Sequence, residues 1–272
     1  ITIRDCLAPF EDAAIDPFLM LHELGPVEAR TVGTLGMHPH RGFVEVPYVK
    51  EGHASMVDHW GETAELTQGM LQWGHVGSGI EHGSGAITKK PEGNMHVFQM
   101  WVNLPKEHKL SSPCFQDVQA ASMPELDFGA GSRAKLLVGR YNSRASPVQT
   151  VTPLQYLDFT VAPGGEHLHA ADPELATRIL FVYQGEAAVG TDPRTAVQAG
   201  QTAVLGREGD SIRVVNAGDG PLGFLLLSGR PLGEPVVKHG PFVMTSREEI
   251  KQAFADFQAG TLCEKRCKYV KL

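Results

Sequence analysis

The sequence predicts an all-β protein that contains two β-barrels and one helix near the C-terminus. Thirty glycines and 18 prolines interrupt the 272 residues at short intervals, with brief β-branched and aromatic runs between them. Short apolar strands separated by turn residues are typical of β-sandwiches and barrels. These signals recur in a similar order in the two halves of the chain, which indicates one barrel unit used twice.

The strand candidates share a high content of valine, isoleucine, leucine and aromatic residues, which favour extended backbone. The clearest are Phe43–Val49, Val97–Val102, Leu154–Val161, Ile179–Val182, Ile212–Val215 and Phe224–Leu227.

One segment, Thr245–Gly260, has the pattern of an amphipathic helix. Ser246 can cap its first turn, and two glutamates follow where the helix dipole favours negative charge. Ile250, Phe254 and Phe257 then recur every three to four residues, so they share one face.

A stretch rich in proline, glycine and serine, Ser111–Ser132, divides the two halves and is interpreted as a linker. A chain of this length has room for two domains of ordinary size. We therefore expect an N-terminal barrel over residues 1–125 and a C-terminal barrel over residues 126–272.

The composition is that of a folded, water-soluble protein. Hydrophobic residues make up 42% of the chain and charged residues 20%, and the net charge is −7 with a sequence pI of about 5.9. The charge gives no basic footprint for nucleic acid, and no apolar run is long enough to span a bilayer. We expect no direct nucleic-acid contact, no membrane contact and a monomer.

Cysteine usage favours a reducing compartment, because Cys6, Cys114, Cys263 and Cys267 are scattered. The printed sequence shows no secretory leader pattern. We expect a cytoplasmic location, and a nuclear one as well if the source is eukaryotic. Cys263 and Cys267 could form a metal or redox clip, but we interpret them as part of a solvated basic tail.

Three histidines carry the clearest chemical signal. His38 and His40 are two residues apart in an extended segment, so both imidazoles point to one face of a sheet. His82, in Gly-Ser-Gly-Ile-Glu-His, comes from a later strand and can complete a facial site. Three protein ligands leave open positions for a substrate or dioxygen, so the pattern predicts a reactive metal site.

The segments around these histidines extend the pattern over nearly the whole chain. They are Asp16–Leu19, His38–Phe43, Gly69–Trp73, Gly77–His82, Gln99–Pro105, Ala203–Gly206, Gly209–Ile212, Pro231–Val237 and His239–Met244. With these segments the sequence resembles the pirin family of the cupin superfamily.

The resemblance implies two stacked, jelly-roll-like cupin barrels with one divalent metal in the N-terminal barrel. Iron is the first choice, with nickel, manganese, copper and zinc as alternatives. The family's ligands are three histidines and one glutamate, and His38, His40 and His82 match the histidines. Members resemble flavonol-cleaving dioxygenases in site chemistry, and some act as nuclear co-regulators of transcription.

The fourth ligand departs from the family pattern. Where pirins read His-any-Glu, this chain reads His82-Gly83-Ser84, and a neutral hydroxyl is a poor metal ligand. We expect Ser84 to hold the fourth position through a water molecule. Glu45 and His96 are alternatives, although Glu45 lies an odd number of residues from His40, which is the wrong parity unless a bulge intervenes. With no carboxylate, a site of charge +2 should favour an anionic substrate oxygen.

Two further histidines are candidate catalytic residues. His75 could act as a general base, or it could be a partly exposed turn histidine. His96 could orient a ligand or the substrate. The predicted substrate-pocket residues, which could also be plain core, are Phe43, Met56, Gln72, Trp73, Gln99 and Trp101.

A second histidine pair, His167 and His169, has the same spacing in the C-terminal half. No later histidine completes it, so we expect the C-terminal barrel to lack a metal.

These observations favour a metal-dependent oxidoreductase of the flavonol (quercetin) dioxygenase type, acting on a small enolic or phenolic molecule. One alternative is a non-redox lyase, isomerase or cyclase that uses the metal as a Lewis acid. Another is an iron-responsive transcriptional co-regulator that binds a protein partner.

Overall fold

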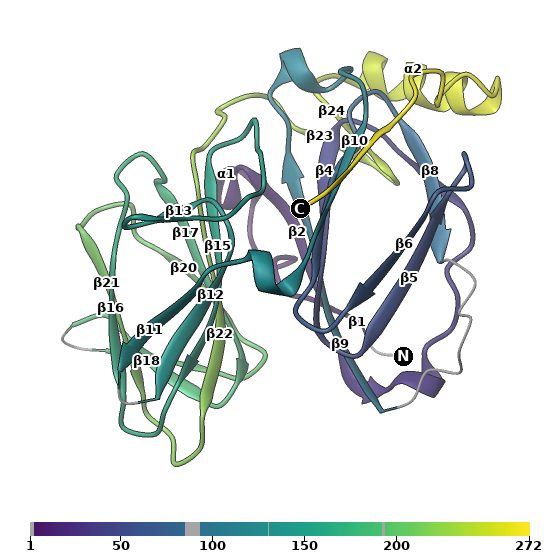
Figure 1. Ribbon diagram of the computed structural model, residues 1–272. Coiled ribbons are helices and arrows are strands. Elements are labelled where there is room, and N and C mark those ends of the chain that lie inside the picture. The colour runs from purple at the N-terminus through teal and green to yellow at the C-terminus, as the bar shows by residue number, and fades with distance from the viewer. Residues whose placement is uncertain (1–2, 85–92, 130, 192–193) are drawn as a thin grey trace. The chain divides into compact units, whose positions relative to one another are not determined.

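A computed structural model describes residues 3–84, 93–129, 131–191 and 194–272 and confirms the all-β class (Figure 1). The chain forms two compact units. The first unit comprises residues 1–5, 18–120 and 232–272, and the second comprises residues 6–17 and 121–231. Among the described residues, no helix has the length and apolar character of a membrane span.

The first unit contains two sheets. The larger sheet has the strand order β1-β2-β9-β4-β7-β10-β25, and the smaller has the order β3-β8-β5-β6. The bounds in the larger sheet are β1 Ile3–Asp5, β2 Phe18–Glu28, β4 Phe43–Glu51, β7 Leu71–His75, β9 Asn94–Asn103, β10 Cys114–Val118 and β25 Lys268–Lys271. Those in the smaller sheet are β3 His38–His40, β5 His53–Asp58, β6 Thr63–Thr67 and β8 Ile80–Ser84.

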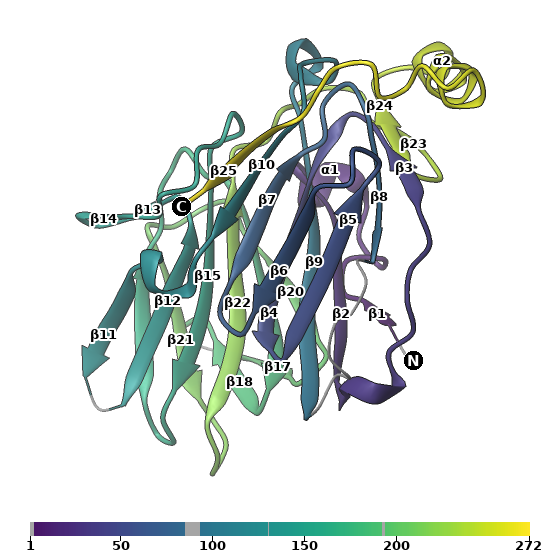
Figure 2. The ribbon, with the colours of Figure 1, turned by 45° about the vertical axis from the view of Figure 1, so that its right-hand side comes forward.

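The two sheets of the first unit pack face to face. Figure 2 shows β5, β6 and β8 as a layer beside β4, β7 and β10. Val49 and Val97 from the larger sheet join Leu66 from the smaller sheet in one buried apolar cluster, with Met56 against it. Side chains alternate between the faces of a strand, so every second residue of these strands points into the interior between the sheets.

The second unit repeats this plan. Its larger sheet has the order β11-β12-β15-β22-β17-β20, and its smaller sheet has the order β16-β21-β18-β19. The bounds are β11 Glu125–Gly129, β12 Ser132–Val138, β15 Leu154–Val161, β16 Glu166–Ala170, β17 Thr177–Gln184, β18 Glu186–Val189, β19 Thr195–Gln198, β20 Thr202–Leu205, β21 Ser211–Asn216 and β22 Leu222–Gly229. The short elements β13 Arg140–Tyr141, β14 Arg144–Ala145 and α1 Asp12–Ile15 complete it.

The expected duplication is visible in the strand order. In each smaller sheet, the first strand along the chain pairs with the last, and the last pairs with the second. The strands β2-β9-β4-β7 likewise correspond to β15-β22-β17-β20. All six predicted strands lie within β4, β9, β15, β17, β21 and β22.

The domain boundaries differ from those expected. The change of unit near residue 120 falls close to the predicted boundary, but Ser111–Ser132 is not an unstructured linker because it contains β10 and β11. Residues 232–272 belong to the first unit, since β25 pairs in parallel with β10. Pairing between segments this far apart in sequence leaves no local pattern.

The C-terminal segment contains the predicted helix, now α2 (Arg247–Gln258), beside the hairpin of β23 (Val237–His239) and β24 (Phe242–Met244). Ser246 caps the helix, and Glu249 completes a capping box. The cysteine-containing tail is not solvated as expected. Cys267 is buried beside Phe115, and all four cysteines are free thiols.

Between β3 and β4, the chain crosses from the smaller sheet to the larger one. Gly42 makes this crossing at φ +92°, and a Cβ there would lie 2.0 Å from the carbonyl oxygen of Val243. Its N–H donates to the Gly77 carbonyl. The crossing resets side-chain alternation, because β3 and β4 are not one continuous strand.

Replacing Gly42 should therefore destabilise the first unit more than an ordinary turn glycine would. We expect Gly42→Ala to lower the free energy of unfolding by roughly 2–4 kcal/mol, through backbone strain plus a collision with Val243. Gly61→Ala is the matched control, because Gly61 also has a positive φ (82°) but open space around its Cβ position. It should cost about 1 kcal/mol. Equal losses in urea denaturation would contradict this assignment.

Candidate metal centre

The structure brings the three predicted histidines together. His38 lies directly opposite His82 in the β3–β8 pairing, and His40 is two residues further along the same face. Potential ligand atoms of all three lie within 4.8 Å of one another. Their ring centroids are 4.6 to 5.0 Å apart. This is the facial arrangement that a single metal ion requires.

Backbone carbonyls orient two of these imidazoles. His38 Nδ1 lies 2.8 Å from the Gly36 carbonyl oxygen, and His40 Nδ1 lies 3.3 Å from that of Pro241. A proton on Nδ1 leaves the Nε2 lone pair for the centre, which is the usual way in which ligand histidines are oriented. Burial and the nearby His38 lower the pKa of His40 to about 3. Burial and the other two histidines also hold the pKa of His82 well below its usual value.

Glu45 supplies a carboxylate at this centre, and the expectation that its parity points it away is wrong. Its Oε1 lies 3.2 Å from His82 Nδ1, and its Oε2 lies 3.8 Å from His40 Nε2. The residue is 1% exposed, and Oε1 has no hydrogen-bond partner among the described residues. Parity failed because Gly42 moves the chain to the opposite sheet before β4 begins.

The larger sheet is shaped to hold this carboxylate. Glu45 lies opposite Trp101 on β9 and Gly74 on β7. A Cβ at Gly74 would lie 2.4 Å from Phe115 Cε1 and 3.0 Å from Glu45 Cγ, so the absent side chain makes room first for the Phe115 ring and also for the glutamate. Gln99 Nε2 donates to Glu45 Oε2 at 3.3 Å. Burial raises the pKa of Glu45 to about 8, although the Gln99 hydrogen bond acts in the opposite direction.

Ser84 lies on the same face of β8 as His82, but its hydroxyl is already engaged. Its Oγ accepts a hydrogen bond from the Leu35 N–H at 2.8 Å, and its own N–H donates to the Leu35 carbonyl. Glu45 rather than Ser84 therefore places an oxygen beside the histidines. This carboxylate also removes the basis for expecting a site of charge +2 that favours anions.

His96 and His75 both lie on the faces of their strands that point away from the centre. His96 has the opposite parity to Gln99 on β9, and its Nε2 lies 3.0 Å from Glu23 Oε1. His75 is adjacent to the inward-facing Gly74, and its Nε2 lies 2.7 Å from Ser111 Oγ. Burial lowers the pKa of His75 to about 4. Neither histidine points to the centre, so the structure does not bring these two predicted catalytic residues together with the metal-site histidines.

The alternation of side chains along a strand places one of the predicted pocket residues, Trp73, on the opposite face of the sheet from the others. Trp73 lies between the inward-facing Gln72 and Gly74, so it is core on the opposite face rather than a pocket wall. The other predicted residues face inward. Phe43 and Trp101 have ring centroids 4.1 Å apart, and each lies 5.3 Å from the His40 ring. They form an apolar wall beside the histidines.

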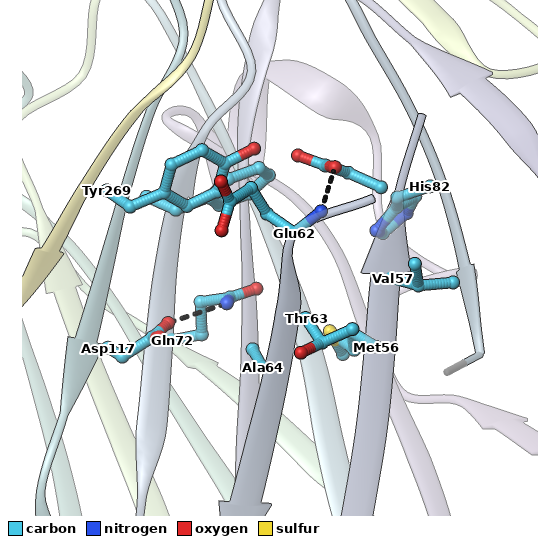
Figure 3. A pocket seen from close by; sticks show the side chains of 11 residues that line it. Met56, Val57, Glu62, Thr63, Ala64, Gln72, His82, Asp117 and Tyr269 are labelled. Atoms are coloured by element: carbon cyan, nitrogen blue, oxygen red, sulfur yellow. Dashed lines mark hydrogen bonds between the residues drawn. The ribbon is translucent and has the colours of Figure 1, made fainter. Parts of the chain in front are cut away.

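A cavity adjoins the centre at His82 (Figure 3). Its volume is about 30 Å³, enough for a water-sized molecule. It was only partly anticipated, since Met56 and Gln72 line it but several acidic and aromatic side chains were missed. Its lining is Met56, Val57, Asp58, Glu62, Thr63, Ala64, Gln72, His82, Phe115, Asp117 and Tyr269.

The second unit places His167 and His169 at the positions that correspond to His38 and His40. His167 lies opposite Val214 in the β16–β21 pairing, where the first unit has His82. Both histidines are buried among aromatic rings. Within the described part of the chain, no third histidine, cysteine or carboxylate joins this pair in a metal-binding group, and the absence of a metal from the second unit stays a prediction.

Comparison with known proteins gives this arrangement a family. A model of pirin matches residues 4–102, and a model of the pirin C-terminal cupin domain matches residues 156–263. The chain belongs to the pirin family. It is 37% identical to human pirin and to a pirin-like protein from Solanum lycopersicum, over 90% of this chain and 82% and 81% of those proteins.

Solved structures agree with this assignment. A quercetin 2,3-dioxygenase from Acinetobacter baumannii superimposes with a TM-score of 0.85 at 28% identity, covering 92% of this chain and 87% of that one. The nickel(II) complex of the Escherichia coli pirin YhhW shares the fold, with a TM-score of 0.57 at 15% identity over 79% of this chain and 83% of that one.

The residues of the centre fit a divalent metal ion. Glu45 Oε1 and His82 Nε2 are buried without partners among the described residues, and unpaired polar atoms in an interior are costly. A cation held by the Glu45 carboxylate would give Oε1 the partner that it lacks. Three imidazoles and one carboxylate suit iron, nickel, copper and zinc, whose binding requires the deprotonated ligands.

Metal binding should depend on Glu45 as well as on the histidines. We expect one equivalent of Ni(II) or Fe(II) per chain, and a loss of affinity of roughly 100-fold or more in His82→Ala and at least about 10-fold in Glu45→Gln. Glu23→Gln is the control, because Glu23 is also buried in the first unit but pairs with His96 away from the centre. A Glu45→Gln protein that binds metal as tightly as the wild type would contradict this ligand set.

The raised pKa of Glu45 has a consequence for the stability of the metal-free protein. The folded carboxyl has a pKa of about 8 against 4.5 ordinarily, so between these values the folded state binds a proton that the unfolded state releases. Stability is therefore lost as the pH rises from 5 to 8, by on the order of a few kcal/mol. The lowered pKa of His40 acts below pH 6.5, where stability falls as the pH falls.

Glu45→Gln isolates the glutamate contribution, because glutamine does not ionise and the histidines remain. In metal-free protein, the stability of Glu45→Gln relative to wild type should increase between pH 5 and pH 8, as measured by urea denaturation. A difference that is constant over this range would show that the Glu45 carboxyl is not held protonated.

Proposed function

We propose that this protein is a metal-dependent oxidoreductase of the quercetin 2,3-dioxygenase type, which acts on a small enolic or phenolic molecule. The observation that carries the proposal is the position of the Glu45 carboxyl group, buried 3.2 Å from His82 and 3.8 Å from His40. Three histidines and one carboxylate hold one metal and leave positions open on it. The Acinetobacter baumannii quercetin 2,3-dioxygenase, with its TM-score of 0.85, supports the same reaction class.

His38, His40, His82 and Glu45 would hold the metal, with iron as the first choice. When bound, the metal supplies Lewis acidity and a site for dioxygen. As a metal ligand Glu45 would be deprotonated, so its negative charge would lower the net charge of the loaded centre.

The surroundings of the centre support a water-poor reaction site. Phe43 and Trp101 cover His40 on one side, and Gln99 keeps the Glu45 carboxylate in place through Oε2. The adjoining cavity, at about 30 Å³, admits a molecule the size of dioxygen or water. A flavonol is larger, so its binding requires side chains such as Tyr269 at the cavity to move.

Oxygen consumption tests the proposal. Fe(II)-loaded protein with quercetin should take up oxygen stoichiometrically with substrate loss, and Glu45→Gln should lower activity by roughly 10-fold to 100-fold because it weakens the metal site. Glu23→Gln should retain activity. Absence of oxygen uptake with Fe, Ni, Mn, Cu and Zn would overturn the dioxygenase assignment. Substrate conversion without oxygen would favour a non-redox lyase or isomerase.

A further inference from the structure

Among the residues that the structure describes, the cavity beside the centre is lined by three carboxylates and by no lysine or arginine. Asp58, Glu62 and Asp117 contribute the acidic groups, and Figure 3 shows Glu62 and Asp117 at the cavity with His82 at its side. Lys271 lies opposite Asp117 in the β10–β25 pairing but does not line the cavity. The electrostatic potential here disfavours an anion.

The two carboxylate oxygens of Asp58 differ in their hydrogen bonding. Oδ1 accepts hydrogen bonds from the N–H groups of Trp60 at 2.9 Å and Glu62 at 3.0 Å, which closes the turn between β5 and β6. Oδ2 is buried and has no partner among the described residues, and the whole residue is 7% exposed. The turn needs only Oδ1, so it does not explain why an oxygen with no partner is kept in the interior.

The position of Asp58 gives that second oxygen a use. Asp58 lies directly opposite His82 in the β5–β8 pairing, on the face that carries the histidines. Side chains at such positions have Cβ atoms about 4.5–5.5 Å apart. A molecule held at the metal and extending into the cavity would therefore pass Asp58 next.

We infer that Asp58 is the substrate-side hydrogen-bond acceptor of the site, and that the site takes a neutral molecule with a free hydroxyl group rather than an anion. The inference rests on the proposed function, since it assigns the substrate class of the same centre. A hydroxyl of the bound molecule donates to Asp58 Oδ2, while its other oxygens face the histidines. Glu62 and Asp117 at the cavity repel carboxylates and other anions.

Binding to Ni(II)-loaded protein tests this without any turnover. The probes are 4-nitrocatechol at a pH where it is neutral, whose absorbance reports its ionisation, and oxalate, an anionic chelator. Asp58→Asn keeps an oxygen for the turn but replaces the free acceptor with an N–H donor. We expect it to weaken 4-nitrocatechol binding by about 10-fold or more and to strengthen oxalate binding. Nickel stoichiometry should stay at one.

The opposite signs separate recognition from damage to the fold. Asp117→Asn is the control, because it removes the same charge from the same cavity but its Oδ1 already accepts from Gln72 Nε2. It should leave 4-nitrocatechol binding within about 3-fold of wild type. Parallel losses of both probes in Asp58→Asn, or no change in 4-nitrocatechol binding, would overturn the inference. Protein that shows the opposite shifts but consumes no oxygen would retain the inference and lose the dioxygenase function.

Discussion

The approach of the Glu45 carboxyl group to His40 and His82 is the contact on which the candidate metal centre depends. A carboxyl group with an unpaired buried oxygen reduces the stability of a folded chain. Here the surroundings are nevertheless arranged to keep it: Gly74 leaves the space, and Gln99 fixes one oxygen. Such an arrangement is typical of a preformed binding site. Binding of the ligand then offsets the free-energy cost of burying the unpaired oxygen.

Two buried cations hold the crossing that delivers Glu45. Lys109 Nζ donates to the Gly42 carbonyl, to the Val243 carbonyl and to Asn103 Oδ1, at 2.6 to 3.1 Å. Arg41 donates to the Ser78 carbonyl and to Asp256 of α2, both at 2.6 Å. Burial lowers the pKa of Lys109 to about 8. Lys109 thereby links the turn between β3 and β4 to Val243 and Asn103, and Arg41 links it to α2.

Much of the fold could be predicted from sequence because its signals are local. The β-branched runs mark β4, β9, β15 and β17, and Ser246 marks the start of α2. The histidine cluster could be predicted too, because His38 and His40 are two residues apart in a strand and therefore lie on the same face. Side-chain alternation could also have placed Trp73 and His96, because Trp73 is one residue from the inward-facing Gln72 and His96 is three residues from the inward-facing Gln99.

The errors arose where geometry is not local. The positive φ of Gly42 moves the chain between sheets, so counting residues from His40 to Glu45 gave the wrong side. The pairing of β25 with β10 joins segments from opposite ends of the chain. The role of Asp58 depends on its register with His82, which is set by the β5–β8 pairing rather than by spacing along the chain.

The return of residues 232–272 to the first unit also fixes when the centre can be completed during synthesis. His40 is oriented by the carbonyl of Pro241, which is synthesised 201 residues later. Asp256, the partner of Arg41, is synthesised later still. The whole barrel of the second unit is translated in between. A nascent chain that has already exposed all three histidines therefore still lacks the support for one of them. The centre therefore reaches the form described above only after residues 232–272 have been synthesised.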